Sequence, residues 1–131
     1  MRFHHIGIIL KSLKGYKSKF QYFLNIKKFS KKYVDNIWNV EIIFATSKED
    51  VIYELISPLN KKSLIINQIE KKINIINHLA FKTKNFEKDT KKLIQKGALP
   101  ITKAQPAVAF KGKNVQFFYT SQNFLYEIIE D

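Results

Sequence analysis

Cysteine is absent from this chain. Its absence excludes disulfide bonds, thiolate metal ligands and cysteine nucleophiles. No run of apolar residues approaches the roughly 20 that span a membrane. The N-terminal sequence MRFHHIGIIL also lacks the basic region, apolar stretch and cleavage site of a signal peptide. We therefore expect a cytoplasmic protein that has no membrane partner.

Acidic residues are scarce: the chain has 11 Asp and Glu residues against 23 Lys and Arg, which gives a net charge of +12. Such a charge attracts anionic partners, among them nucleic acid, an acidic membrane or a phosphorylated small molecule. The lysines, however, are spread along the chain in short pairs such as Lys27-Lys28 and Lys71-Lys72. This spacing favours a solvated surface, and the sequence carries no recognisable nucleic-acid-binding motif, so we expect no nucleic-acid partner.

A shortage of apolar residues, which marks disordered chains, is not seen here. Hydrophobic residues make up 45% of the sequence, which includes 11 Phe and 6 Tyr. A chain of 131 residues with this composition can bury a core and fits one domain.

Apolar runs typical of strands dominate the first part of the chain. The helical spacing of Tyr16, Phe20, Phe23 and Leu24 predicts an amphipathic helix over residues 14–26. Strands are predicted over residues 3–10, 40–45 and 51–56, with a weak strand near residues 29–34 and a short helix over residues 63–71.

The same order of elements is predicted again in the second part of the chain. A strand at residues 75–83 is followed by a helix at 86–96 that Gly97 closes, and then by strands at 107–110, 115–119 and 124–129. The sequence therefore predicts an α+β fold of two βαβββ modules that form a curved mixed β-sheet around a cleft. We place both modules in one domain of residues 1–131, with module one at about 1–60, a linker at about 61–73 and module two at about 74–131.

An internal repeat supports this division. A shift of 73 residues places His5-Ile6 on His78-Leu79, because 78 − 5 = 73. The same shift places the segment YELI around Glu54 on the segment YEII around Glu127, because 127 − 54 = 73. One shift therefore aligns two histidines and two glutamates together with their apolar neighbours.

The four aligned residues form a candidate metal site: His5, Glu54, His78 and Glu127. Each His lies near the start of the first strand of its module and each Glu lies in the last strand, so the alternation of a strand turns these side chains to one face. An ionised Glu in an apolar strand is costly unless it is paired, and a metal ion supplies that pairing. Two imidazoles and two carboxylates suit Zn, Ni, Co, Mn or Fe(II) better than Mg or Ca.

The segments FHHIGIIL, VIYELISPL, INHLAFKTKNFEKDTKKLIQKG and NFLYEIIE resemble the glyoxalase/bleomycin-resistance (vicinal-oxygen-chelate) family, and within it the methylmalonyl-CoA epimerase-like proteins. The resemblance covers nearly the whole chain. It implies the repeated βαβββ fold and a metal site in which His5, His78 and Glu127 match the family's ligands. Glu54 lies where the epimerases typically carry Gln and the glyoxalase I enzymes carry Glu, so the resemblance leaves the subfamily open.

The resemblance also implies chemistry at the carbon α to a carbonyl. In this family the metal binds a substrate oxygen and stabilises an enolate-like intermediate, while a carboxylate moves the proton. Glu54 or Glu127 is the candidate for proton transfer on one face of the substrate. For the other face, the family's epimerases place a Glu shortly before a Gln-x-Val segment, and in the matching residues 33–40 the nearest acid is Asp35. Asp35 is therefore the third candidate catalytic residue, and the alternative for it is a role as a turn residue.

Two functions are compatible with these residues. The first is a metal-dependent isomerase, epimerase or lyase of the acyl-CoA epimerase or glyoxalase type. The second is a non-catalytic protein that binds or sequesters a small molecule, as the bleomycin-resistance members do. The complete set of four ligands favours an enzyme. We expect a small-molecule substrate, with an anionic acyl thioester as the candidate that the lysines would attract, and the two modules can pair within one chain or across a homodimer.

Overall fold

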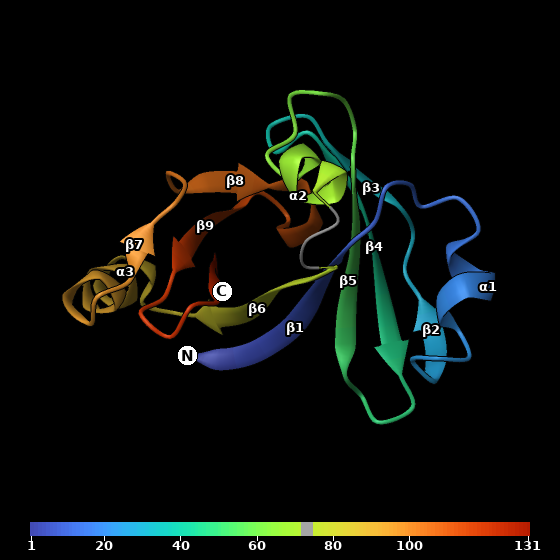
Figure 1. Ribbon diagram of the computed structural model, residues 1–131. Helices are drawn as coiled ribbons and strands as arrows, with labels where there is room; N and C mark the ends of the chain where they lie inside the picture. The colour runs from blue at the N-terminus through green and yellow to red at the C-terminus, as the bar shows by residue number, and fades with distance from the viewer. Residues whose placement is uncertain (72–74) are drawn as a thin grey trace. The chain divides into compact units, whose positions relative to one another are not determined.

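Strands dominate the structure, as the apolar runs of the sequence predict. The computed structural model describes residues 1–71 and 75–131. Within them it contains ten β-strands, three α-helices and one 3-10 helix, which confirms the predicted α+β class (Figure 1). The last two residues of the predicted linker and the first residue of the second module lie outside the described residues. No helix in the described part of the chain is long and apolar enough to cross a membrane.

The chain divides into two compact units. The N-terminal unit consists of His5–Asn77, and the C-terminal unit consists of Met1–His4 together with His78–Asp131. Strand β1 (Arg2–Ile9) gives its first residues to the C-terminal unit and the rest to the N-terminal unit. Each unit is described by itself below.

The N-terminal unit is built on a mixed sheet with the strand order β2-β4-β5-β1, and β3 pairs with β4. Its strands after β1 are β2 (Ile26–Phe29), β3 (Tyr33–Asp35), β4 (Val40–Ser47) and β5 (Ile52–Pro58). Strand β5 runs parallel to β1 and antiparallel to β4. Two short helices complete the unit, α1 (Tyr16–Phe20) and α2 (Ile66–Glu70).

The core of the N-terminal unit lies on one face of this sheet. Ile8, Ile43 and Leu55 project from three neighbouring strands and form a buried cluster with Leu13, Ile26 and Ala45. Tyr16 and Phe20 of α1 pack against this cluster. Because side chains alternate along a strand, the residues before and after each core residue face the other side of the sheet.

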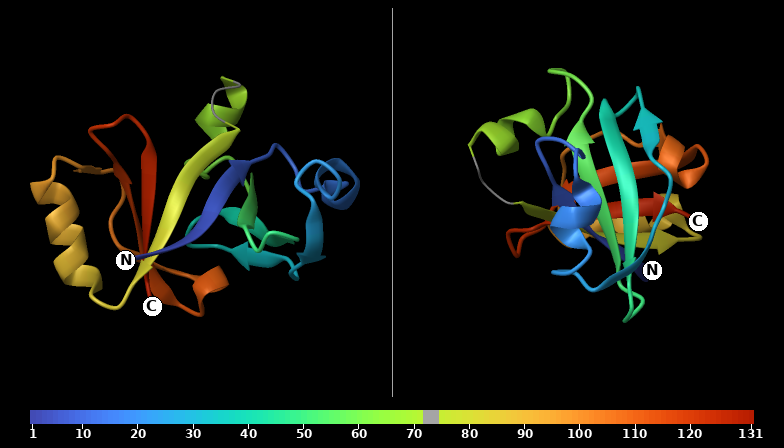
Figure 2. Two further views of the ribbon diagram at one scale, coloured as in Figure 1. Left: turned by 90° about the horizontal axis from the view of Figure 1, so that it is seen from below. Right: turned by 90° about the vertical axis from the view of Figure 1, so that its right-hand side faces the viewer.

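The C-terminal unit repeats this plan with the strand order β6-β10-β9-β7, and β8 pairs with β9. Its elements are β6 (Ile76–Thr83), α3 (Phe86–Gln95), β7 (Leu99–Pro100), β8 (Gln105–Ala107), the 3-10 helix η1 (Val108–Phe110), β9 (Lys113–Tyr119) and β10 (Leu125–Glu130). The first two residues of β6 belong to the N-terminal unit. Helix α3 lies along one face of the strands of the C-terminal unit (Figure 2).

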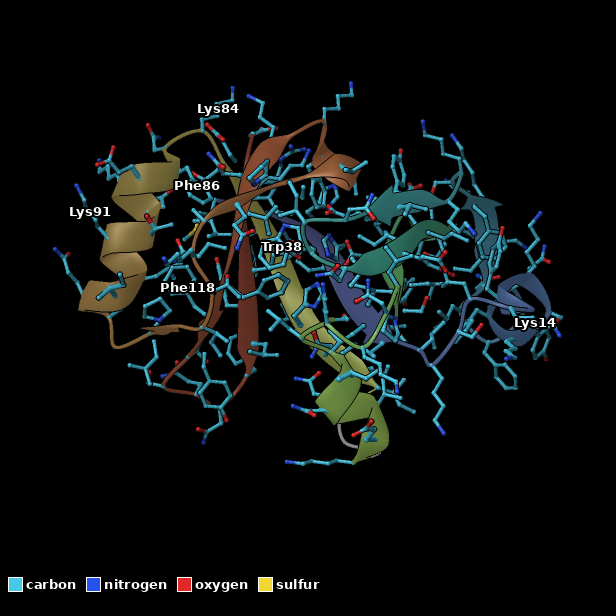
Figure 3. All side chains as sticks on the ribbon, turned by 90° about the horizontal axis from the view of Figure 1, so that it is seen from above. Lys14, Trp38, Lys84, Phe86, Lys91 and Phe118 are labelled. Carbon is cyan, nitrogen blue, oxygen red and sulfur yellow. The ribbon has the colours of Figure 1, made fainter. Side chains whose placement is uncertain are left out.

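Helix α3 covers the core of the C-terminal unit. Phe118 of β9 is buried with Tyr126 and Ile128, and Phe86 and Leu93 of the helix pack on them (Figure 3). The helix ends where the sequence predicts, because Gly97 follows it with a φ of 92°. This left-handed conformation costs glycine little.

The observed strands and helices differ from the sequence predictions in four ways. Each unit carries one short strand more than the three predicted after its helix. The weak strand expected near residues 29–34 lies across the break between β2 and β3. The helix expected over residues 14–26 is only Tyr16–Phe20, since the chain turns at residues 21–25, and this leaves Phe23 82% exposed. The strand expected at residues 107–110 is a 3-10 helix after Ala107, which a left-handed Lys111 with a φ of 56° ends.

The internal repeat is confirmed in the pairing of the strands. Gly7 pairs with Glu54 in the N-terminal unit, and Ala80 pairs with Glu127 in the C-terminal unit. Both partners differ by the same shift, because 80 − 7 = 73 and 127 − 54 = 73. The two units therefore share strand order, direction and register, and not only a short sequence pattern.

Candidate metal centre

The N-terminal unit buries one histidine and one glutamate side by side. His5 of β1 is 0% exposed and Glu54 of β5 is 2% exposed. The imidazole Nε2 of His5 lies 3.7 Å from the carboxylate Oε2 of Glu54. Parallel pairing of β1 with β5 brings the two side chains to one face of the sheet, opposite the core cluster that contains Leu55.

The C-terminal unit contains the matching pair. His78 of β6 is 3% exposed and Glu127 of β10 is 2% exposed. The Nε2 atom of His78 lies 2.9 Å from Oε2 of Glu127. Ile128, the next residue in β10, points into the core under α3, so this pair also occupies the face of the sheet that α3 does not cover.

Sequence reasoning missed an aromatic ring that lies beside each His–Glu pair. Phe44 lies directly opposite Glu54 in the register of β4 and β5, and its ring centroid is 5.8 Å from that of His5 at an interplanar angle of 66°. Phe117 lies directly opposite Glu127, and its ring centroid is 5.1 Å from that of His78 at 89°. The signal was present in the sequence, because 117 − 44 = 73.

Each His–Glu pair suits a metal ion by its chemistry and its spacing. All four residues are buried, and each offers one imidazole nitrogen or carboxylate oxygen as a ligand atom. Two atoms in neighbouring positions on one ion, with bonds of about 2.1 Å, lie about 3.0–3.4 Å apart. The separations of 3.7 and 2.9 Å lie close to this range. A buried carboxylate also requires compensation by charge or by hydrogen bonds, and a divalent ion would provide such a charge.

Asp35, the third candidate catalytic residue, holds a turn in the structure. Its side chain is 0% exposed, and Oδ1 accepts hydrogen bonds from the backbone N–H groups of Ile37 and Trp38, both at 2.9 Å. Two residues earlier in β3, the ring of Tyr33 contacts Phe44 with centroids 6.0 Å apart. Since Asp35 and Tyr33 alternate onto the same face, Asp35 belongs to the face of the N-terminal sheet that carries His5 and Glu54.

His4, the neighbour of His5 in β1, has a separate environment. Its ring packs edge-on against Phe110 with centroids 5.6 Å apart, within the C-terminal unit. His4 is half-buried. The contact with Phe110 is that of a packed side chain of β1.

One family model matches most of the chain. It describes the Glyoxalase/Bleomycin resistance protein/Dioxygenase superfamily and matches residues 4–117, which include His5, Glu54 and His78. No protein of curated function matches the sequence at a significant level.

Several solved structures share the fold. A hypothetical protein from Bacillus halodurans C-125 has a TM-score of 0.84 at 26% identity, covering 99% of this chain and 94% of that one. Methylmalonyl-CoA epimerase from Mycobacterium tuberculosis has a TM-score of 0.81 at 16% identity, covering 98% of this chain and 87% of that one. A variant of the Streptomyces coelicolor methylmalonyl-CoA epimerase, in complex with 2-nitronate-propionyl-CoA, has a TM-score of 0.80 at 17% identity, covering 100% and 97%. At such low identities the two epimerases show the fold alone.

Proposed function

Since the chain belongs to the glyoxalase/bleomycin resistance protein/dioxygenase superfamily, we propose that it is a metal-dependent enzyme acting at the carbon α to a carbonyl. In this proposal His5, Glu54, His78 and Glu127 bind one divalent ion together. The observation that carries the proposal is the repetition of a buried His–Glu pair, with the same strand register and the same aromatic neighbour, in both units.

The ligand set narrows the choice of metal. Imidazole nitrogen and carboxylate oxygen together suit Zn, Ni, Co, Mn or Fe, whereas Mg and Ca favour oxygen ligands alone. An ion held by these four residues would act on a substrate through any position that the protein leaves open, which is what distinguishes a catalytic from a structural site.

The reaction that this site suits is an epimerisation, isomerisation or lyase reaction that begins with removal of an α-proton. A divalent ion supplies a Lewis acid that polarises a carbonyl oxygen and makes the neighbouring C–H more acidic. A carboxylate oxygen of Glu54 or Glu127 then accepts the proton on one face of the substrate. In an epimerisation, a second acid returns a proton to the same carbon on the other face, so the atoms balance without a co-reactant.

We assign the second proton-transfer role to Asp35. The position is distinctive, because Asp35 pairs with Val40 in the N-terminal unit, and the corresponding pair in the C-terminal unit is Ala107 with Lys113 (113 − 40 = 73). Alanine cannot transfer a proton, so only the N-terminal unit has an acid at this position. Burial of the Asp35 side chain also keeps its carboxyl away from bulk water.

The substrate class that we propose is an acyl thioester with an anionic group. The net charge of +12 attracts such a molecule, and the similar Streptomyces coelicolor structure contains an acyl-CoA analogue. We also propose a cytoplasmic location. Proteins of the reducing cytoplasm rarely contain disulfide bonds, and a chain without cysteine forms none.

Metal analysis of freshly purified protein tests the proposal first. We expect about one Zn, Ni, Co, Mn or Fe per chain, lost in His5→Ala and in Glu127→Gln but kept in the control Glu41→Gln. Glu41 is a half-buried acid of β4 that pairs with Lys32 and lies outside both His–Glu pairs. Far-UV circular dichroism checks that each variant is folded.

Substrate screening follows from a positive result. Methyl-branched acyl-CoA thioesters and α-keto hemithioacetals are incubated in deuterated water, and incorporation of deuterium at the α-carbon is read by mass spectrometry. Metal-dependent incorporation is the expected result. If the protein binds none of these metals even after Co or Ni is added, the enzymatic proposal fails, and the chain is better assigned to small-molecule binding of the bleomycin-resistance type.

A further inference from the structure

A row of apolar side chains crosses the sheet of the C-terminal unit from His78 to the outer edge. His78 pairs with Leu125, Leu125 pairs with Tyr119, and Tyr119 pairs with Leu99. Directly paired residues project to the same face of a sheet. Leu125, Tyr119 and Leu99, which we call the apolar row, therefore continue the face that carries His78 and Glu127.

Solvent exposure increases along the row. His78 is 3% exposed, Leu125 is half-buried, Tyr119 is 39% exposed and Leu99 is 65% exposed. Neighbouring strands lie about 4.8 Å apart, so the four strands span about 14 Å. The row therefore connects a buried candidate ligand with solvent over a distance that suits an extended chain of several carbons.

The apolar character of the row is not required by the fold. The corresponding positions of the N-terminal unit are Ile52, Thr46 and Lys28, since Ile52 pairs with Thr46 and Thr46 pairs with Lys28. These three residues cross the N-terminal sheet in the same way, but Thr46 carries a hydroxyl group and Lys28 carries a positive charge. A buried core cluster of the C-terminal unit, which includes Phe118 and Ile128, lies on the opposite face, under α3. Tyr119 and Leu99 are exposed on the face away from this cluster, and neighbouring exposed apolar side chains of this kind suit a binding surface.

We propose that the apolar row binds a hydrocarbon chain of the substrate, which makes a medium-length acyl group the preferred substrate class. The inference rests on the proposed metal function, because His78 anchors the row at the reacting group. Ile101 widens the surface, since it is 53% exposed and its backbone N–H donates to the carbonyl of Phe117 at 2.9 Å. A second copy of the chain is a poorer occupant, because a stable dimer buries about 800 Å² on each partner, more than three or four side chains provide.

Alkyl hydroxamic acids test the proposal directly, because their two neighbouring oxygens chelate a metal while the alkyl chain is varied. The probes are acetohydroxamate, hexanohydroxamate and octanohydroxamate, titrated calorimetrically into the metal-loaded protein. We expect the affinity to rise about fourfold for each added methylene group that the row buries. In Leu99→Ser and Tyr119→Ser this gain becomes smaller, while the affinity for acetohydroxamate stays the same. The matched control is Leu64→Ser, which replaces a leucine that is 68% exposed in the N-terminal unit and keeps the full gain.

The outcomes separate the two proposals. Tight binding of acetohydroxamate with no gain from longer chains overturns the apolar row and leaves the metal function standing. If acetohydroxamate does not bind, the metal function fails. Binding of hydrocarbon chains to the apolar row is then tested separately with a series of primary alkyl amides, read by NMR shifts of the Leu99 and Leu125 methyl groups. A dimer that Leu99→Ser converts to a monomer in sedimentation equilibrium assigns the row to contact between copies and overturns the proposal.

Discussion

At the scale of single residues, the buried carboxylates are the features that demand an explanation. Glu54 and Glu127 are each 2% exposed, and Asp35 is 0% exposed. Transfer of a charged carboxylate from water into a protein interior costs several kcal/mol unless charge or hydrogen bonds compensate it. For Asp35 the compensation includes two backbone N–H groups, and for the two glutamates the structure provides a histidine at the carboxylate oxygen.

Asp35 allows its structural and catalytic roles to be separated by substitution. Asp35→Asn keeps an oxygen that accepts from Ile37 and Trp38 but cannot transfer a proton, so we expect stability within about 1 kcal/mol of the original protein and a large loss of α-proton exchange. Asp35→Ala removes the acceptor and is expected to lower the free energy of unfolding by about 1–3 kcal/mol. Urea denaturation and deuterium incorporation measure the two effects. Full exchange activity in Asp35→Asn would leave Asp35 with the turn role alone.

At the scale of strands and helices, register decides which side chains meet. Phe44 and Phe117 face the two glutamates across antiparallel strand pairs, and each ring packs edge-on against the histidine of its own unit. Edge-to-face packing of this kind restricts rotation of the imidazole, so Nε2 stays directed at the carboxylate. Neighbours that orient a metal-ligating histidine commonly change metal affinity when they are replaced.

Replacing either aromatic ring tests this orientation. We expect Phe44→Leu and Phe117→Leu each to weaken metal binding by about tenfold, with a changed absorption spectrum of the cobalt-loaded protein. Competition with a chromophoric chelator measures the affinity. Phe29→Leu is the matched control, because Phe29 packs against Tyr16, 5.1 Å between centroids, beside the core cluster of the same unit. If Phe29→Leu and Phe44→Leu lower the affinity equally, the effect is one of general stability rather than of imidazole orientation.

At the scale of the whole molecule, the question is whether the two pairs act on one ion. Each unit holds one histidine and one glutamate of the proposed set of four. A ligand that binds only the folded state stabilises it by about 2.7 kcal/mol at a concentration of 100 times its dissociation constant. An ion shared by all four residues stabilises both units at once, whereas an ion held by one pair stabilises one unit.

Hydrogen exchange distinguishes these cases. We expect added metal to slow amide exchange in β5 and in β10 to a similar extent, with one ion bound per chain. In His5→Ala, exchange in both strands is expected to become independent of metal. If His5→Ala abolishes the effect in β5 and leaves it intact in β10, each pair binds its own ion and the single-site proposal is wrong.

Much of the fold was readable from the sequence because its signals are local. Period-two apolar patterns predicted the main strands, and helical spacing before Gly97 predicted α3 within one residue. The shift of 73 residues predicted the repeat that the strand registers confirm. The length of α1 was overestimated, because Phe23 shares the helical spacing although it lies in the turn that follows and is exposed.

By itself, the sequence determined that His5 and Glu54 have counterparts in His78 and Glu127, because matching residue types at a constant shift can be read directly from a sequence. Only the tertiary structure decided which residues lie opposite these four. Phe44 and Phe117 reach their histidines through strand pairing, and Leu99 joins the face of His78 across two further strands. Such partners are set by the register of segments far apart in the chain, and a one-residue slip in register would turn every one of them to the opposite face.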